Sequence, residues 1–365
     1  MITKDKFGPE YIVKVYDSKI GMKGFLVIDN TALGLGKGGI RMTPNVNEEE
    51  VWRLARTMTW KNALAEIPFG GAKAGIIWRG GSDELKKQYI QSFARAVKLF
   101  TPKKYIAGPD VNTGEKEMQW FVEATGSKKT ATGKPKNLGG LPHELGSTGF
   151  GVAQATLVAA KLKGLDIKKT TIAIDGFGNV GSFAFKFLKK FGAKIVAIAD
   201  SRGATFTKQG FNEKELIKLK SQGKSVSEYS GAKKLQRSDI FGLNVDILIP
   251  AAVTDIINEK NKNIIKSKII VEGANIPMRE KIEEELHNRG ILIVPDFVAN
   301  AGGVISSYAE YRGYNSKKMF EIVKRKITKI TKAVLEESIK SNKNPRSVAL
   351  KIAKYKVEAR MKNKN

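Results

Sequence analysis

The first half of the chain alternates hydrophobic and polar residues in a way that predicts short strands followed by amphipathic helices. Two β-rich runs, residues 11–16 and 24–28, flank a glycine-bearing turn and are typical of paired strands. Asn47 is a suitable helix N-cap with Glu50 three residues later, and apolar residues follow at helical spacing. This helix is expected to end before Pro68, because the residue that precedes a proline disfavours helical backbone. Two further helices are expected over residues 82–100 and 115–125.

The second half changes to short apolar runs separated by helical segments, which is the pattern of a doubly wound parallel sheet. Strands are expected over residues 171–174, 195–199, 245–249, 269–271 and 291–294. From residue 317 onward the sequence is helical and polar, with an apolar stripe over residues 348–359.

This change of pattern, in a chain of 365 residues, predicts two domains. Residues 126–149 are rich in Gly, Lys, Pro and Ser and form the candidate hinge. We therefore expect a two-domain α/β protein: an N-terminal α/β substrate and oligomerisation domain over residues 1–137, then a Rossmann domain over residues 138–342. Residues 343–365 are expected to form a helix that returns to the first domain. A cleft between the domains is the natural ligand site, and its closure would exclude water.

Composition excludes several kinds of chemistry. The chain has no cysteine and only two histidines, His143 and His287, so disulfides, thiolate nucleophiles and Cys- or His-rich metal sites are not expected, and acid–base chemistry falls to Lys, Asp or Glu. No stretch reaches the twenty or so apolar residues of a membrane span, and the first residues carry no apolar signal region. A cytoplasmic protein without metal or membrane partners is the expectation.

The formal net charge of +28 raises nucleic acid binding as a rival function, because lysine-rich surfaces attract phosphate. The lysines, however, are spread along the whole chain, without a basic arm or a recognisable nucleic-acid-binding motif. A general lysine bias is therefore the favoured interpretation, and a nucleic acid partner is not expected.

One glycine motif indicates a dinucleotide site. Gly176, Gly178 and Gly181 form Gly-x-Gly-x-x-Gly between an expected strand and an expected helix, where a helix N-terminus meets the pyrophosphate. Asp200 ends the next strand at the spacing of a ribose ligand and favours NAD, whereas Arg202 would accommodate the 2′-phosphate of NADP. An ordinary glycine-rich turn is the alternative. The predicted cofactor is NAD or NADP.

Three lysines stand in unusual settings. Lys61 projects from the apolar stripe of its helix, where it needs an anionic partner unless it reaches back to water. Lys73 follows Pro-Phe-Gly-Gly-Ala, and Lys37 lies in a glycine-rich loop, residues 34–39, so both sit among residues with almost no side chain. Desolvation would lower the pKa of such a lysine toward neutrality, as a general base requires; a flexible surface loop is the alternative for either.

Several motifs, in the correct order, resemble the glutamate, leucine, phenylalanine and valine dehydrogenase family. They cover most of the chain: Leu35-Gly-Lys-Gly-Gly-Ile-Arg-Met-Thr-Pro44, Met58-Thr-Trp-Lys-Asn-Ala-Leu64, Pro68-Phe-Gly-Gly-Ala-Lys-Ala-Gly75, Gly108-Pro-Asp-Val111, Ser147-Thr-Gly-Phe-Gly-Val152, Glu272-Gly-Ala-Asn-Ile-Pro277 and Asn300-Ala-Gly-Gly-Val304.

The resemblance implies a role for each matching residue. Lys73 would activate the water that attacks the imino carbon, and Asp110 would shuttle protons to and from the amino group. Lys61 would bind the substrate α-carboxylate. Lys37 and Ser307 would bind the far carboxylate of glutamate, beside Val304. The implied cofactor ligands are Thr148, Asn275 and Asn300 at the nicotinamide end, Ala251 and Ala252 at the adenosine side, and Gly176, Gly178, Asn179, Val180, Gly181 and Asp200 around the phosphates and ribose.

The predicted function is reversible oxidative deamination of L-glutamate to 2-oxoglutarate and ammonia. Lys37 and Ser307 favour glutamate, because leucine-type members of the family lack that lysine. The alternative is the same reaction on a branched-chain or aromatic amino acid, since Arg312-Gly-Tyr-Asn315 and the N-terminal part resemble leucine dehydrogenase. A non-catalytic NAD-binding or nucleic-acid-binding protein is a remote alternative, and so is a 2-hydroxy acid dehydrogenase, which usually needs a histidine base. The family forms hexamers or octamers, so a homo-oligomer is expected, with a hexamer favoured.

Overall fold

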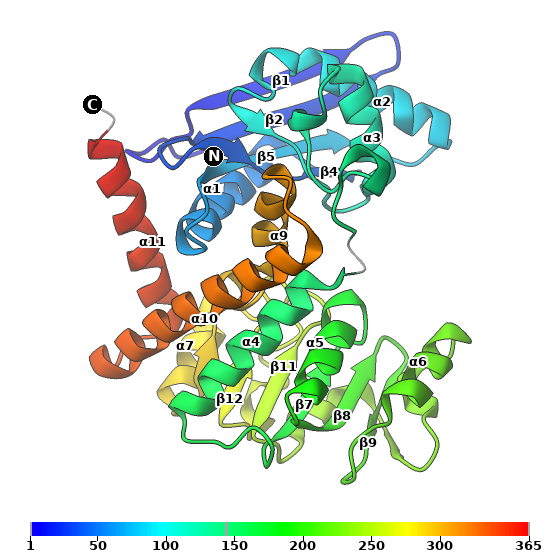
Figure 1. Cartoon of the computed structure of the whole chain (residues 1–365), viewed down its shortest axis with the longest axis vertical. Helices are drawn as coiled ribbons and strands as arrows, with labels where there is room; N and C mark the ends of the chain where they lie inside the picture. Colours follow the sequence, from blue (N-terminus) through cyan, green and yellow to red (C-terminus); the bar gives the residue numbers. More distant parts are fainter. Residues whose placement is uncertain (1, 143–144, 364–365) are drawn as a thin grey trace. The chain divides into compact units, whose positions relative to one another are not determined.

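The computed structural model describes residues 2–142 and 145–363, which form two compact units. Unit 1 comprises Met1–Leu145, Val304–Met319 and Leu350–Asn365, and unit 2 comprises Gly146–Gly303 and Phe320–Ala349. The two-domain α/β fold class predicted from the sequence is confirmed (Figure 1).

The boundaries differ from the predicted ones at residues 137 and 342, and the segment Val304–Met319 joins unit 1 instead of the Rossmann unit. The reason is long-range packing. Glu310 accepts hydrogen bonds from the backbone N–H groups of Gly133 and Leu141, and the ring of Tyr308 packs edge-on against that of Phe69. Residues 133 and 310 are 177 positions apart, so no local pattern could reveal their contact.

Unit 1 is built on a six-stranded mixed sheet in the order β1-β2-β5-β3-β6, with β4 paired to β5. The β1–β2 and β2–β5 pairs are antiparallel, and β3 and β4 lie parallel to β5. The elements that begin in this unit are β1 (Tyr11–Asp17), β2 (Met22–Asn30), β3 (Leu35–Lys37), β4 (Ile40–Thr43), α1 (Glu48–Leu64), β5 (Phe69–Ile77), α2 (Asp83–Ala96), η1 (Lys98–Phe100), β6 (Tyr105–Ile106), α3 (Glu115–Thr125), η2 (Lys128–Thr130) and η3 (Lys136–Leu138).

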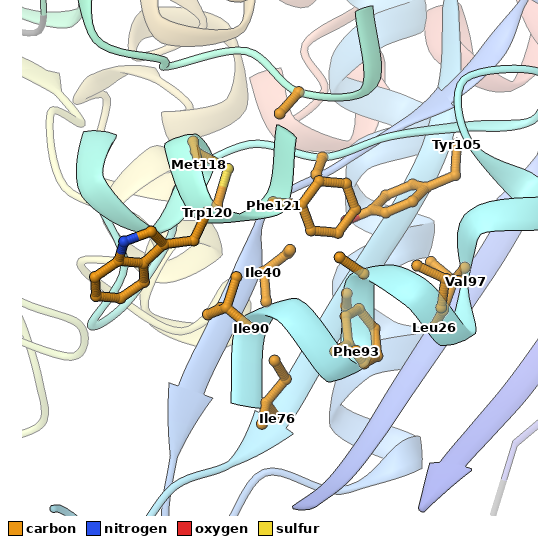
Figure 2. Close-up of a cluster of buried hydrophobic side chains, with 14 of the residues drawn as sticks. Leu26, Ile40, Ile76, Ile90, Phe93, Val97, Tyr105, Met118, Trp120 and Phe121 are labelled. Carbon is orange, nitrogen blue, oxygen red and sulfur yellow. The ribbon is translucent and has the colours of Figure 1, made fainter. Parts of the chain in front are cut away.

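The hydrophobic core of unit 1 lies between this sheet and helices α2 and α3. Figure 2 shows Leu26, Ile40 and Ile76 from the strands facing Phe93 and Phe121 from the helices. Helix α1 covers the other side of β5, and its N-terminus is capped as predicted, since the Asn47 side chain accepts a hydrogen bond from the Glu50 N–H. The core therefore fixes β5 at the centre of the sheet, between two helical layers.

The glycine-rich stretch around Lys37, which was interpreted as a loop, and the stretch around Lys73, for which a flexible loop was the alternative, both form strands. Lys37 ends β3, and Lys73 lies in the middle of β5. A Cβ atom on Gly71 would lie 2.0 Å from the Thr59 hydroxyl oxygen of α1, and one on Gly70 would lie 2.0 Å from the Asn30 carbonyl oxygen. The glycines thus allow α1 to approach β5 closely. Because glycine has a low strand propensity, the sequence did not indicate a strand at these positions.

Unit 2 has a seven-stranded sheet in the order β10-β9-β8-β7-β11-β12-β13. Strands β8, β7, β11, β12 and β13 are parallel, as predicted, and the antiparallel strands β9 and β10 extend one edge. Its elements are α4 (Ser147–Leu162), β7 (Thr171–Asp175), α5 (Asn179–Lys190), β8 (Lys194–Asp200), β9 (Gly203–Phe206), α6 (Glu213–Ser221), η5 (Val226–Glu228), β10 (Lys233–Leu235), η6 (Arg237–Gly242), β11 (Ile247–Pro250), η7 (Lys262–Ile264), β12 (Ile269–Val271), α7 (Glu280–Asn288), β13 (Leu292–Val294) and α8 (Asp296–Ala299).

Three more helices complete the chain: α9 (Gly302–Tyr311), α10 (Ser316–Ser341) and α11 (Pro345–Lys362). They confirm the helical C-terminal region predicted from residue 317. Of the helices in residues 2–142 and 145–363, none is long and apolar enough to span a membrane.

Candidate active site

The buried Lys73 and the half-buried Asp110 form an ion pair in unit 1. Lys73 Nζ lies 3.0 Å from Asp110 Oδ2, and Arg41 Nε donates to the same oxygen at 2.9 Å. Burial lowers the pKa of the Lys73 ammonium from its usual value, and the attraction of Asp110 offsets only part of that effect. Burial alone would raise the pKa of Asp110, but Lys73 and Arg41 hold it below its usual range. The aspartate is therefore ionised at neutral pH, beside a lysine that releases its proton more readily than a surface lysine.

Arg41 is part of this site although sequence reasoning gave it no role. It lies on β4 and bridges Asp110 to Glu50 on α1. The sequence did contain an indication of this role, because Arg41 belongs to the first of the motifs that resemble the dehydrogenase family. A guanidinium can bind two carboxylates at once in fixed directions, so Arg41 orients Asp110 relative to the sheet.

Lys37 is a second buried lysine, only 4% exposed. Its ammonium donates to the Ala107 carbonyl oxygen at 2.8 Å, and the part of the chain that the structure describes places no carboxylate within 4 Å of it. Burial lowers the pKa of Lys37 to about 7; Glu310 opposes this shift, and Lys73 and Lys134 add to it. A lysine in this state gains its charge readily when an anion arrives.

Thr132 is a further residue that sequence reasoning missed. It is fully buried, and no partner was found for its hydroxyl among the residues described. A Cβ added to Gly108 would lie 2.5 Å from Lys37 Nζ and 3.6 Å from Thr132 Oγ1, so Gly108 leaves room beside both groups. Thr132 lies in the segment interpreted as a hinge. The glycine, lysine and proline residues around it are typical of an exposed loop, so the sequence did not predict that Thr132 is buried.

The other predicted substrate residues lie on helices of the same unit. Val304 and Ser307 are half-buried on α9, at positions three apart and therefore on one face of the helix. Glu310, a further three residues on, accepts from Lys134 Nζ and from the N–H of Gly133, which fixes this face against the segment that carries Thr132. Lys61 is half-buried in the last turn of α1.

The glycine turn of unit 2 follows β7 and opens α5, as predicted. Gly176 has a φ of +102°, which a side chain would strain, and a Cβ on Gly181 would lie 1.8 Å from the Gly176 carbonyl oxygen. A Cβ on Gly178, in contrast, would meet no atom within 4 Å. Gly176 and Gly181 thus close the turn, while Gly178 leaves open space before the N–H groups of Asn179 and Val180. This shape fits a pyrophosphate.

The neighbouring loops of unit 2 place further predicted cofactor residues around this turn. Ala251 and Ala252 follow β11, and the backbone of Ala252 would lie 2.7 Å from a Cβ on Gly176. Asn300 Nδ2 donates to Asn275 Oδ1 at 2.9 Å, so the structure brings this predicted pair together. Thr148 is half-buried in the first turn of α4, with its hydroxyl 3.1 Å from where a Cβ on Gly303 would lie.

The loop that carries Asn275 is held by a buried charge cluster. Arg346 Nη2 lies 2.8 Å from Glu272 Oε2 and 3.0 Å from Asp296 Oδ1, and Arg346 Nε donates to Glu283. Asp296 Oδ2 accepts from the Ile276 N–H at 3.0 Å. Burial raises the pKa of both Glu272 and Glu283, and Arg346 opposes the shift. The sequence gave no indication that one arginine from α11 would bind three acids from unit 2.

His287, in the last turn of α7, takes no part in these sites, and His143 lies outside the described residues.

A dinucleotide-type turn on a doubly wound sheet, and an ion pair between a buried lysine and a half-buried aspartate in the other unit, are the features of a nicotinamide-dependent dehydrogenase. Comparison with known proteins gives the family. Residues 139–365 match the profile of glutamate/leucine/phenylalanine/valine dehydrogenase, and residues 9–127 match its dimerisation domain. The chain belongs to this family of amino acid dehydrogenases, which confirms the resemblance and an NAD or NADP cofactor.

Individual relatives agree with this assignment. The chain is 39% identical to a glutamate dehydrogenase of Aeropyrum pernix over 357 residues, covering 91% of this chain and 84% of the relative. It is 39% identical to an NADP-specific glutamate dehydrogenase of Saccharolobus shibatae over 299 residues, covering 79% and 70%. The solved hetero-hexameric glutamate dehydrogenase of Thermus thermophilus superposes with a TM-score of 0.85 at 25% identity, covering 98% of this chain and 90% of that one.

Proposed function

We propose that the chain catalyses the reversible oxidative deamination of L-glutamate to 2-oxoglutarate and ammonia, with NAD or NADP as the hydride acceptor. The observation that carries the choice of substrate is the buried Lys37 amine beside the Thr132 hydroxyl, which has no partner among the residues described. The Lys37 ammonium has the Ala107 carbonyl oxygen as a hydrogen-bond partner but no counter-charge in ion-pair contact among the residues described, and the Thr132 hydroxyl has no partner among them. A buried cation without an anion and a buried hydroxyl without a hydrogen bond are both costly, and a carboxylate would satisfy both groups.

An apolar substrate side chain would leave the Lys37 ammonium without an anion and the Thr132 hydroxyl without a hydrogen bond. Sites built to bind a polar group reject analogues that lack it far more strongly than apolar pockets reject an extra group. The second carboxylate of glutamate would bind Lys37 and Thr132, with Ser307 contributed from the neighbouring face of α9. A leucine, valine or phenylalanine side chain would offer neither charge nor acceptor.

The α-carbon chemistry is assigned to Lys73 and Asp110. A bound nicotinamide would supply the acceptor for the hydride that leaves the substrate Cα. The imine carbon that remains is attacked by water, from which Lys73 in its neutral form accepts a proton. Asp110 accepts a proton from the substrate ammonium before oxidation and returns one to the departing amine. Lys61 would hold the α-carboxylate, so that the substrate is fixed at both ends.

The overall reaction balances with these roles. L-glutamate, water and the oxidised cofactor give 2-oxoglutarate, ammonium, the reduced cofactor and one proton, which leaves through the Lys73–Asp110 pair. The proposal is supported by relatives that are named glutamate dehydrogenases. A homo-oligomer, of hexameric form, is proposed on the strength of the hexameric neighbour and the match of residues 9–127 to a dimerisation domain.

The test is an assay of cofactor reduction by the purified chain with glutamate, leucine, valine and phenylalanine, each with NAD and with NADP. We expect turnover with glutamate and little with the other three. Lys37→Leu should raise the KM for glutamate by about 100-fold or more, because it removes one charge-assisted contact and leaves a carboxylate unpaired. The control is Lys14→Leu, which removes a lysine whose side chain is 69% exposed in the same unit.

Unchanged glutamate kinetics in Lys37→Leu would refute the substrate assignment, while turnover of leucine in preference to glutamate would point to the apolar branch of the family.

A further inference from the structure

The segment after β8 in unit 2 carries a polar cluster that the reaction described above does not use. In doubly wound sheets that bind dinucleotides, the end of the second strand meets the adenosine ribose. Here that position is Asp200, the last residue of β8. The chain then forms the short strand β9, helix α6 and the 3-10 helix η5, which returns to Asp200.

Asp200 already accepts four hydrogen bonds from its own chain. Its Oδ1 accepts from the Arg202 N–H at 3.0 Å and the Ser225 hydroxyl at 2.8 Å. Its Oδ2 accepts from the Val226 N–H at 2.9 Å and from Lys220 Nζ at 3.0 Å. An ionised carboxylate offers about four lone-pair positions, so these donors use its full capacity.

The carboxylate keeps its charge in this arrangement. Burial by itself would raise the pKa of Asp200, but the donors from Val226, Lys220, Arg202 and Ser225 lower it to about 2. Asp200 is therefore an ionised anchor that ties the loop before η5 to the end of β8. It has no remaining lone pair with which to accept from the two ribose hydroxyls of NAD.

Positive charge surrounds this anchor. Lys220 is one-third exposed, and Arg202 is exposed, with Nη2 held by the Gly223 carbonyl oxygen at 2.7 Å. Lys224 lies in the same loop. Asp200 and the Gly223 carbonyl thus hold two cations in place where a dinucleotide would bring its ribose. Fixed, partly exposed cations of this kind suit a phosphate monoester, which supplies acceptor oxygens and no donors.

We propose that Arg202 and Lys220 form a site for the 2′-phosphate of NADP, and that Asp200 positions them instead of binding ribose. This inference rests on the proposed dehydrogenase function and specifies its cofactor. It assigns NADP as the preferred nucleotide and gives Asp200 a different role from the ribose ligand that its sequence position predicts.

The test is equilibrium binding of NADPH and NADH, followed by nucleotide fluorescence in the absence of any amino acid. We expect the wild-type chain to bind NADPH at least about tenfold more tightly. Lys220→Gln and Arg202→Gln should each weaken NADPH binding by about tenfold while changing NADH binding less than about twofold. The matched control is Lys218→Gln, which removes an exposed lysine from another side of the same helix and should change neither affinity.

Two nucleotide fragments that lack the nicotinamide test the adenosine half of the site separately. Adenosine 2′,5′-bisphosphate should compete with NADPH more strongly than adenosine 5′-phosphate, and Lys220→Gln should remove that difference. Equal or tighter binding of NADH by the wild-type chain would overturn the inference. Glutamate oxidation with NAD alone would leave the proposed function standing and refute only this cofactor assignment, whereas failure to bind either nucleotide would refute both.

Discussion

Lys73 Nζ and Arg41 Nε converge on one oxygen of Asp110, Oδ2, at 3.0 Å and 2.9 Å. Among the residues described, no donor is assigned to the second oxygen, Oδ1. The arrangement gives Asp110 one oxygen that holds it in place and one that can exchange protons with a substrate amine. It also keeps Lys73 next to the carboxylate that receives its proton or returns it.

Replacing Lys73 with alanine should abolish turnover without weakening cofactor binding. The substitution removes the group assigned to water activation in unit 1, whereas the glycine turn is in unit 2. We expect kcat to fall by at least about 100-fold, the usual contribution of a positioned acid or base. Steady-state kinetics and nucleotide fluorescence measure the two effects separately. A variant that keeps more than a tenth of the wild-type kcat would contradict the assigned role.

Arg41→Gln should shift the pH profile toward higher pH. Arg41 is one of two cations that lower the pKa of Asp110, so its loss raises that pKa and Asp110 stays protonated to a higher pH. The acid limb of the kcat/KM profile should therefore move to higher pH, and Arg41→Lys should move it back part of the way. A fall in activity with an unchanged profile would instead mean that Arg41 only stabilises the fold.

Binding of glutarate should weaken as the pH rises above 7. Lys37 has a pKa of about 7 in the free protein and must be protonated to pair with a carboxylate, so binding requires proton uptake at higher pH. The dissociation constant should be flat below pH 7 and then rise by up to about tenfold per pH unit. Glutarate is a suitable probe because it has two carboxylates and no amino group, and calorimetry in buffers of different ionisation enthalpy would count the protons.

Lys37→Leu is the control for this titration. It should bind glutarate weakly at every pH and without the slope. A slope that survives in the variant would assign the titration to another group, of which Lys73 is the nearest candidate because it interacts electrostatically with Lys37.

Arg346→Met should destabilise unit 2 by about 3–5 kcal/mol at neutral pH, because three buried carboxylates lose their common cation. The pKa values of Glu272 and Glu283, already raised by burial, would rise further above their unfolded values. Stability then falls as the pH rises toward the folded-state pKa values, so the deficit should be larger at pH 8 than at pH 5. Thermal unfolding across this range measures it.

The matched control is Arg279→Met, which breaks an ion pair of the same unit in which the arginine side chain is 69% exposed. Such a pair contributes at most about 1 kcal/mol. Equal losses in the two variants, or a deficit for Arg346→Met that does not depend on pH, would mean that the buried cluster carries little of the stability of the loop that holds Asn275.

The sequence by itself determined what depends on neighbouring residues. The Asn47 cap, the alternation of parallel strands and helices after residue 170, and the Gly176-x-Gly-x-x-Gly turn each rest on contacts within a few residues, so pattern and spacing predicted them. The family motifs, in their order along the chain, also predicted that Lys73 and Asp110 are both catalytic residues. Their contact with each other could not be derived from their spacing in the sequence.

Only the tertiary structure decided which groups are buried and what each one binds. Lys37 was indistinguishable from a loop lysine until β3 placed it inside unit 1, and Thr132 was hidden in a segment rich in glycine and lysine. Asp200 stood at the position of a ribose ligand, yet its lone pairs accept from the Arg202 N–H and from three donors of residues 220–226. Burial, pKa and hydrogen-bond partners arise from residues tens to hundreds of positions apart, and no local pattern encodes such contacts. The reaction class could therefore be predicted from the sequence, whereas the charge states and the assignment of each polar group required the fold.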